Sequence, residues 1–146
     1  LEGRSPGQAI IAGDGTDIAE LVDAAQRLDD SHLFIQGPPG AGKTYAGSRL
    51  IVALIQQGCR IGVSSNSHKA INNLLAAVEQ HASESGVLFH GVKKSSTEES
   101  RFNGSLITDE ASNDAVTGSG ADLLAGTAWL FAREELDQTL DYLFVD

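Results

Sequence analysis

Eight consecutive residues combine glycines, a lysine and a hydroxyl group. They read GPPGAGKT, from Gly37 to Thr44, and fit the pattern GxxxxGK[ST]. Glycines let the backbone curl so that its amides face an anion, Lys43 can reach the β- and γ-phosphates of a nucleotide, and the Thr44 hydroxyl can bind Mg²⁺. The pattern therefore predicts a site for ATP and Mg²⁺. Its candidate nucleotide-binding residues are Gly37, Pro38, Pro39, Gly40, Ala41, Gly42, Lys43, Thr44 and Tyr45.

An acid follows the last apolar segment of the chain. LDYLFVD, residues 140–146, predicts an apolar strand that ends at Asp146. In P-loop enzymes an Asp holds Mg²⁺ together with the hydroxyl of the loop, so we expect Thr44 and Asp146 to be the metal ligands. With Lys43 they are the candidate catalytic residues for phosphoryl transfer from ATP to water. An acid that merely happens to end a strand is the alternative.

The glycine motif binds phosphates when it lies between a strand and a helix. HLFIQ, residues 32–36, predicts a strand before the motif, and residues 43–58 predict a helix closed by its final glycine. TDIAELVDAAQRL, from Thr16, predicts an earlier amphipathic helix. CRIGVSS, residues 59–65, predicts a second strand, and Ser67 is placed to cap the helix that follows. This alternation predicts an α/β fold in which helices flank a parallel sheet.

The second half of the chain continues this pattern after an interruption. VLFHGV, residues 87–92, predicts a third strand. The chain then becomes polar from about 93 to 120, which predicts an insertion without a core of its own. ADLLAGTAWLF, residues 121–131, returns to a strand followed by a helix.

Composition limits the class of protein. A chain of 146 residues is long enough for one ordinary domain. The formal net charge of −10 gives no basic footprint, which argues against a stand-alone nucleic-acid binder. Cys59 is the single cysteine, so no intrachain disulfide can form and we expect a reducing, cytoplasmic location. The apolar run LIVALI is too short to cross a bilayer, so we expect a soluble protein with no membrane partner.

Three motifs together resemble superfamily 1 helicases. Lys43 and Asp146 are 103 positions apart, about twice the separation usual in AAA+ ATPases. VSSNSHKAINNLL follows the second predicted strand, where helicases of the 5′-to-3′ branch carry motif Ia, and its SHxAI variant resembles helicase modules fused to RecB-like nucleases. LLAGTAWLFA resembles the GT-containing strand end of the same family. The resemblance covers about residues 30–80 and 122–146.

The resemblance implies that residues 1–146 are the ATP-binding part of the first RecA-like domain, truncated after the Walker B strand. It implies ATP hydrolysis coupled to translocation on, or unwinding of, single-stranded nucleic acid, with DNA favoured over RNA. The catalytic Glu, the arginine fingers, a second RecA-like domain and a fused nuclease would lie beyond residue 146, so this fragment alone is expected to be inactive. The implied nucleic-acid contacts are Ser67, His68, Lys69, Gly126 and Thr127.

Two other functions stay open. A small-molecule or nucleotide kinase also uses a P-loop, but it needs an arginine-rich lid, and this chain has only 10 lysines and arginines together. An ATP-sensing regulatory module that does not move along a polymer fits the acidic charge and the incomplete site. Stimulation of ATP hydrolysis by single strands separates the helicase from both alternatives.

Several residues have two interpretations. Trp129 suits base stacking, although a partly buried packing role is favoured. Lys93, Lys94 and Arg101 form either a small phosphate-binding patch or, as is more usual for adjacent lysines, a solvated edge. Gln26 is a weak candidate for reading adenine, as is Gln8. His81 and His90 have no partners at metal-ligand spacing, and no zinc site is predicted.

Overall fold

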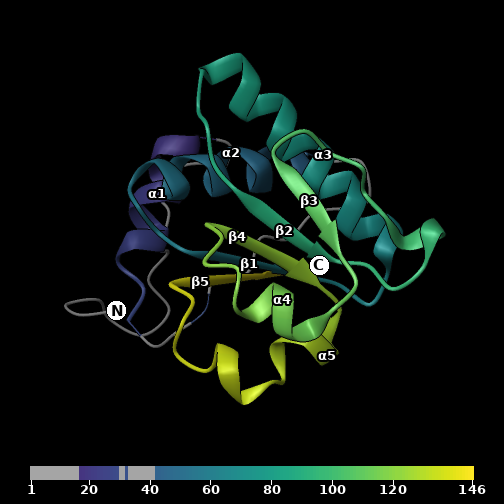
Figure 1. The fold of residues 1–146 in the computed structure, drawn as a ribbon. Helices are drawn as coiled ribbons and strands as arrows, with labels where there is room; N and C mark the ends of the chain where they lie inside the picture. Colours follow the sequence, from purple (N-terminus) through teal and green to yellow (C-terminus); the bar gives the residue numbers. More distant parts are fainter. Residues whose placement is uncertain (1–16, 30–31, 33–41) are drawn as a thin grey trace.

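The fold is described from a computed structural model, which covers residues 17–29, 32 and 42–146. Within them, five parallel strands form one sheet in the order β3-β2-β4-β1-β5 (Figure 1). The prediction of a parallel sheet flanked by helices is therefore confirmed. Except for His32, the strand predicted at 32–36 lies outside the described residues, as do residues 37–41 of the glycine motif. The elements are α1 (Ile18–Gln26), α2 (Lys43–Gln56), β1 (Ile61–Ser64), α3 (His68–Ser85), β2 (Gly91–Lys94), the 3₁₀ turn η1 (Glu98–Ser100), β3 (Ile107–Glu110), α4 (Asn113–Thr117), β4 (Leu123–Gly126), α5 (Ala128–Phe131), the 3₁₀ turn η2 (Glu134–Leu136) and β5 (Tyr142–Val145).

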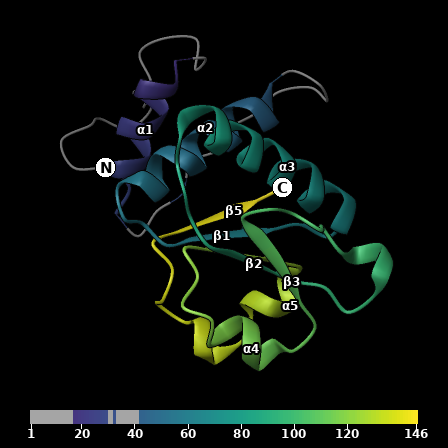
Figure 2. The same ribbon diagram turned by 45° about the horizontal axis from the view of Figure 1, so that its top comes forward.

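Helices cover both faces of the sheet. In Figures 1 and 2, α1, α2 and α3 lie on one face, and α4 and α5 lie on the other. Side chains alternate along the strands accordingly. Val63 and Ala125 belong to the core under α2 and α3, whereas Val92 and Leu124 pack with Leu130 of α5. Because both faces are covered, all four residues of β1 and of β4 are buried.

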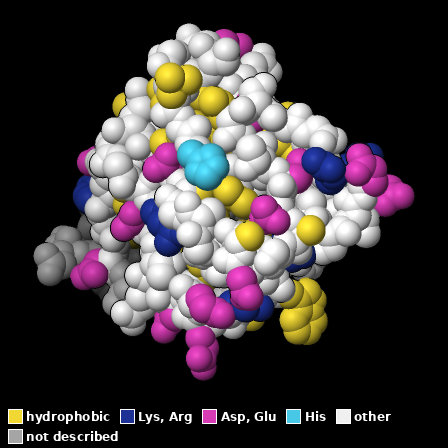
Figure 3. Space-filling view, in the orientation of Figure 1, with side chains coloured by type: hydrophobic (Ala, Val, Ile, Leu, Met, Phe, Trp, Pro, Cys, Tyr) yellow, Lys and Arg dark blue, Asp and Glu magenta, His cyan; other side chains and the backbone are white. Residues whose placement is uncertain are grey.

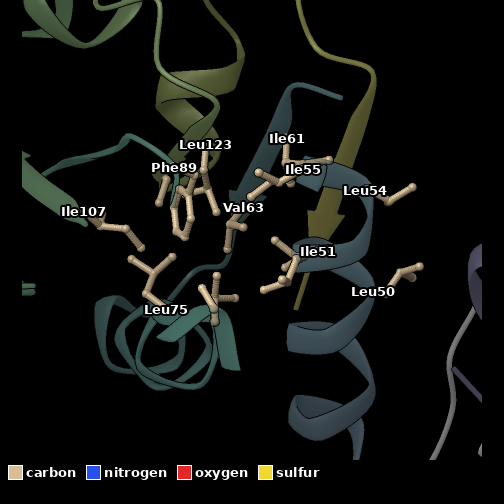
Figure 4. Close-up of a cluster of buried hydrophobic side chains, with 14 of the residues drawn as sticks. Leu50, Ile51, Leu54, Ile55, Ile61, Val63, Leu75, Phe89, Ile107 and Leu123 are labelled. Carbon is tan, nitrogen blue, oxygen red and sulfur yellow. The ribbon is translucent and has the colours of Figure 1, made fainter. Parts of the chain in front are cut away.

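The larger core joins α2 and α3 to the sheet (Figure 4). Ile51 of α2 and Leu75 of α3 are completely buried against Ile61 and Val63 of β1. Each such side chain stabilises the fold by roughly 1.5–3 kcal/mol relative to an exposed one. This packing fixes how α2 and α3 lie over the strands, and so where their first turns are held.

The predicted helix ends are confirmed by their caps. The Ser67 hydroxyl accepts a hydrogen bond from the amide of Ala70 at 3.3 Å, which starts α3 at His68. Asp17 caps α1 in the same way, through the amide of Ala19 at 2.9 Å. Gly58 adopts φ +83° just after α2, as expected for a helix-ending glycine.

The third predicted strand is wrong by about four residues. It was expected at 87–92, but β2 begins at Gly91 and ends at Lys94. Val87 and Phe89 are buried, yet they reach the core from the connection between α3 and β2. An apolar pattern reports burial, whereas a strand requires a neighbour to pair with, and β2 pairs with β3 and β4 only from Gly91 onward.

The polar segment 93–120 contains regular structure that the sequence did not predict. β3 pairs with β2 at the edge of the sheet, and the short helix α4 follows it. Within β3 only Ile107 is buried, because an edge strand needs few apolar side chains. Hydrophobic alternation is therefore too weak in ITDE to indicate a strand.

Two carboxylates hold this segment in place, one within the segment and one on α3. Asp109 accepts hydrogen bonds from the amides of Phe102 and Asn103, both at 2.8 Å, and from the Ser95 hydroxyl at 2.7 Å. Glu79 of α3 accepts the amides of residues 105, 106 and 107 at 3.1, 2.8 and 2.9 Å. Buried backbone amides without partners would destabilise the fold, so these acids help to hold a segment that has few apolar side chains.

We expect Asp109→Asn to lower the free energy of unfolding by about 1–3 kcal/mol at neutral pH, because the amide cannot accept all the bonds that the carboxylate accepts. Burial raises the pKa of the Asp109 carboxyl, but the bonds from Phe102, Asn103 and Ser95 and the charge of Lys93 outweigh it and hold that pKa below its usual value. The ionised form therefore stabilises the fold above pH about 4, and this contribution is lost as pH falls further.

Denaturant unfolding at several pH values tests this prediction. The difference in unfolding free energy between the wild type and Asp109→Asn should shrink as pH falls through about 4. The exposed Asp137 provides a matched control, since its change to Asn should shift stability by no more than about 0.5 kcal/mol. A difference that stays constant with pH would show that the Asp109 charge contributes nothing.

Candidate functional site at the carboxyl edge of the sheet

All strands of a parallel sheet end at the same edge, and ligands of open α/β sheets bind beyond those carboxyl ends. Here Ser64 of β1 is in register with Gly126 of β4 on one side and Val145 of β5 on the other. Residues that follow these strands therefore emerge side by side, although they are far apart in the sequence. Among them are Ser67 and Thr127, both predicted site residues.

Asp146 lies beside the end of β1. Its amide donates a hydrogen bond to the carbonyl oxygen of Ser64 at 3.0 Å, which extends the pairing of β5 with β1 by one residue. The Asp146 side chain is exposed. Its carboxylate is thus free to face a ligand at this edge.

The first turn of α2 lies at the same edge. Only residues 57–60 connect the end of α2 to the start of β1, so the other end of α2 lies toward the carboxyl end of β1. α3 starts at that edge, and a methyl group at Gly47 of α2 would contact Leu74 Cδ1 of α3 at 3.6 Å. α2 and α3 therefore run side by side in the same direction, which places Lys43 and Thr44 near the start of α3 and beyond the strand ends.

The structure describes the last three residues of the glycine motif, Gly42, Lys43 and Thr44. Gly42 caps α2 with φ +88°, a left-handed conformation that side-chain-bearing residues rarely adopt. Lys43 and Thr44 follow in the first turn, and both are exposed. The amides at the start of such a helix favour an anion. The exposed ring of Tyr45 stacks on the guanidinium of Arg49, 3.4 Å from the ring centroid, so this ring is already held by its own helix.

The predicted nucleic-acid residues at the start of α3 differ in what they can offer. The Ser67 hydroxyl is used as the helix cap, and the Ser67 amide donates to the Ser65 hydroxyl at 3.2 Å. The Lys69 side chain is exposed. His68 is half-buried, and its Nδ1 has no hydrogen-bond partner. Burial, and then the charges of Lys93 and Lys94, lower the pKa of His68, so its imidazole is neutral at neutral pH.

Gly126 and Thr127 connect β4 to α5. An added Cβ at Gly126 would lie 2.7 Å from Leu130 Cδ2 and 3.4 Å from the Lys94 Cβ, so this glycine lets α5 pack closely on the sheet. Thr127 precedes the first residue of α5, but its hydroxyl makes no capping hydrogen bond. Gly126 is therefore explained by packing, whereas the Thr127 side chain is available to a ligand.

The structure corrects the preferred interpretation of two other residues. Lys93 was expected at a solvated edge, but it is completely buried, and its ammonium donates to the carbonyl oxygen of Ser100. Burial lowers the Lys93 pKa, and the charge of Asp109 opposes that effect. Trp129 was expected to be packed, but its side chain is 87 % exposed. The helical pattern of apolar residues could not show that Trp129 is exposed while its neighbour Leu130 is buried.

The remaining candidates lie apart from this edge or have other partners. The side-chain amide of Gln26 donates to the side-chain oxygen of Gln57, and Gln8 lies outside the described residues. Within residues 17–29, 32 and 42–146, no group of His, Cys, Asp or Glu is arranged to hold a metal ion. No helix in the described part of the chain is long and apolar enough to span a membrane.

A cavity of about 730 Å³ lies at the other end of α3, lined by residues such as Glu79, Leu88 and Phe102. Glu79 is eleven residues after His68, which is about 16 Å along a helix. Its carboxylate is already occupied by three backbone amides. The one titratable group that lines the cavity is therefore already used, and the carboxyl edge is the better candidate site.

Comparison with known proteins gives one short similarity. The chain is 36 % identical over 56 residues to the DNA replication ATP-dependent helicase/nuclease DNA2 of Saccharomyces cerevisiae. The match covers 38 % of this chain and 4 % of that protein. No protein-family model matches the chain, and no solved structure matches it. The similarity indicates a region related to a helicase/nuclease over a small part of that protein's length.

Proposed function

We propose that this chain is the ATP-binding part of the first RecA-like domain of a superfamily 1 helicase, which hydrolyses ATP to move on single-stranded DNA. One observation carries the proposal. Lys43 and Thr44 at the start of α2 are brought to the same sheet edge as Asp146 and as the loops after β1 and β4. The group proposed to bind phosphate and the surface proposed to bind the polymer would therefore adjoin. The similarity to the yeast helicase/nuclease supports the choice of polymer.

The residues of the edge suit the two parts of a Mg-ATP site. The turn at Gly42 and the exposed Lys43 suit the binding of phosphate oxygens by backbone amides and an ammonium group. The Thr44 hydroxyl and the Asp146 carboxylate are oxygen ligands, which Mg²⁺ prefers. When bound, Mg²⁺ would draw negative charge from the β- and γ-phosphates. Lys43 would neutralise charge on the same oxygens, so catalysis would rest on positioning and electrostatics.

The test is ATP hydrolysis by the full-length protein with and without oligo(dT) or oligo(rU). We expect oligo(dT) to raise the rate by at least about tenfold, which corresponds to about 1.4 kcal/mol of barrier. Stronger stimulation by oligo(rU) would change the polymer to RNA. Hydrolysis that ignores both strands would contradict the helicase and favour the ATP-sensing module, and transfer of the phosphoryl group to a small molecule would favour the kinase.

A separate prediction concerns the charges of His68 and Lys69 at the start of α3. Because His68 is neutral at neutral pH, we expect His68→Gln to leave the salt dependence of strand binding unchanged. Lys69→Gln should reduce the slope of log affinity against log salt by about 0.7, the value for one phosphate contact on a single strand. Binding of labelled oligo(dT), measured by anisotropy at several salt concentrations, distinguishes the two. A reduced slope for His68→Gln would show that the imidazole becomes charged in the complex.

A further inference from the structure

An exposed tryptophan stands at the carboxyl edge without a structural role. A hydrophobic side chain projects at the lower right of Figure 3, over α5, the helix that carries Trp129. A tryptophan can bury about 150–250 Å² of surface, which would stabilise the fold by several kcal/mol. Trp129 contributes little of this stabilisation, since it is 87 % exposed. Its ring is therefore available to a ligand.

The backbone that carries this ring is held firmly. α5 starts directly after β4, and its Leu130 is buried in the core formed with Val92 and Leu124. Leu130 also packs over Gly126, where an added Cβ would clash with it. Trp129 is thus presented from a fixed helix rather than from a loop, so little conformational entropy would be lost when a ligand covers it.

The positively charged Lys94 lies next to α5. Alternation along β2 places Lys94 on the α5 side of the sheet, and its Cβ lies 3.4 Å from the Cβ position of Gly126. The Lys94 ammonium donates to the Ser96 hydroxyl at 2.6 Å. In the described part of the chain, no carboxylate lies in ion-pair range of Lys94, although the protein is strongly acidic.

Charges on the other side of Trp129 limit the path of any anionic ligand. Arg133 is paired with Asp114 at 3.2 Å and with Glu135 at 3.0 Å, so it offers no free charge. Glu134 is exposed close to Arg133. The acids on the η2 side of Trp129 repel a polyanion. On the other side Lys94 attracts it, and the cross-strand neighbour Glu110 holds its carboxylate on the amides of Ala111 and Ser112. The Thr127 hydroxyl is also available there.

An exposed aromatic ring on α5 and a cation on the strand next to β4 match the base and the phosphate of a single-stranded nucleic acid. We propose that Trp129 stacks on a base of the bound strand while Lys94 pairs with an adjacent phosphate, so that the strand crosses the end of β4 on the Lys94 side of α5. This inference rests on the proposed function, because it places a strand at the same edge as the nucleotide. It adds two residues to those that the helicase motifs indicate.

The single tryptophan makes a direct test possible. When this 146-residue chain is excited at wavelengths that its two tyrosines scarcely absorb, its fluorescence comes from Trp129. Oligo(dT) should quench this fluorescence, whereas an abasic strand of the same length should bind without quenching. Trp129→Ala should weaken oligo(dT) binding by about 5- to 100-fold, and Trp129→Phe should restore most of the affinity. Lys94→Gln should reduce the salt slope by about 0.7.

Leu88→Ala is the matched control, since Leu88 is 86 % exposed but lies next to the distant cavity. It should not change strand affinity. Equal affinity of wild type and Trp129→Ala, or binding without quenching, would overturn the stacking role. The proposed function is judged separately by strand-stimulated ATP hydrolysis of the full-length protein, which can persist without Trp129. Absence of any strand binding by this chain would also overturn the inference and favour a protein partner for the exposed ring.

Discussion

Replacing Lys43 by alanine should lower kcat/KM for ATP hydrolysis by the full-length protein by about 100- to 1,000-fold, the usual effect of removing one charge-stabilising group from a transition state. Lys43 is exposed in the first turn of α2, where alanine is also a good helix former. The free energy of unfolding should therefore change by no more than about 0.5 kcal/mol. The loss would be one of chemistry and binding rather than of folding.

Steady-state hydrolysis at saturating oligo(dT) is the measurement for Lys43→Ala. Arg27→Ala is the control, since it removes an exposed cation at the end of α1, where Arg27 pairs with the nearby Asp23. It should leave hydrolysis unchanged. A Lys43→Ala protein that keeps near-normal activity would remove the main support for a phosphate-binding lysine at the start of α2.

Replacing Asp146 by asparagine should reduce hydrolysis by a similar factor, about 100-fold or more, and raise the Mg²⁺ concentration needed for half-maximal rate. Asparagine keeps the size of the side chain, and the hydrogen bond of residue 146 to Ser64 uses the backbone amide. The pairing of β5 with β1 should therefore survive. The variant would lose one negative charge at the proposed Mg²⁺ site.

Hydrolysis measured over a range of Mg²⁺ concentrations tests the role of Asp146. Asp137→Asn, which neutralises an exposed acid elsewhere, should leave the Mg²⁺ dependence as it is. Asp146→Asn with unchanged Mg²⁺ dependence would mean that this acid merely ends a strand. In that case the metal would be held through other groups.

The sequence predicted those parts of the fold in which local chemistry and burial agree. Ser67 caps a helix and Gly58 ends one because a hydroxyl acceptor and a left-handed glycine are local requirements. β1 and β4 were predictable because both faces of these strands are covered. β3 was not predictable, because ITDE lies at the sheet edge. It is held by pairing with β2 and by the hydrogen bonds that its Asp109 accepts from the amides of Phe102 and Asn103.

The sequence predicted the motif residues of the candidate site, but it did not predict which of the neighbouring side chains are exposed. The spacing of Lys43 and Thr44 indicated phosphate binding, and the apolar run before Asp146 indicated a strand end. The sequence could not show which of the adjacent residues Lys93 and Lys94 is free to bind a ligand. Lys93 is buried only because side chains alternate between the two faces of β2. The exposure of Trp129 depends in the same way on how the short helix α5 sits against Gly126.

The order of the strands has a consequence for how this chain folds. β1 lies between β4 and β5, so both of its neighbours come from residues at least 59 positions later in the sequence. Such non-local pairing is slow, since a long loop must close before any bond forms. During synthesis the apolar β1 therefore stays unpaired until β4 and β5 have left the ribosome. The helices α2 and α3, which contact each other locally, are the part that can form first and shield it.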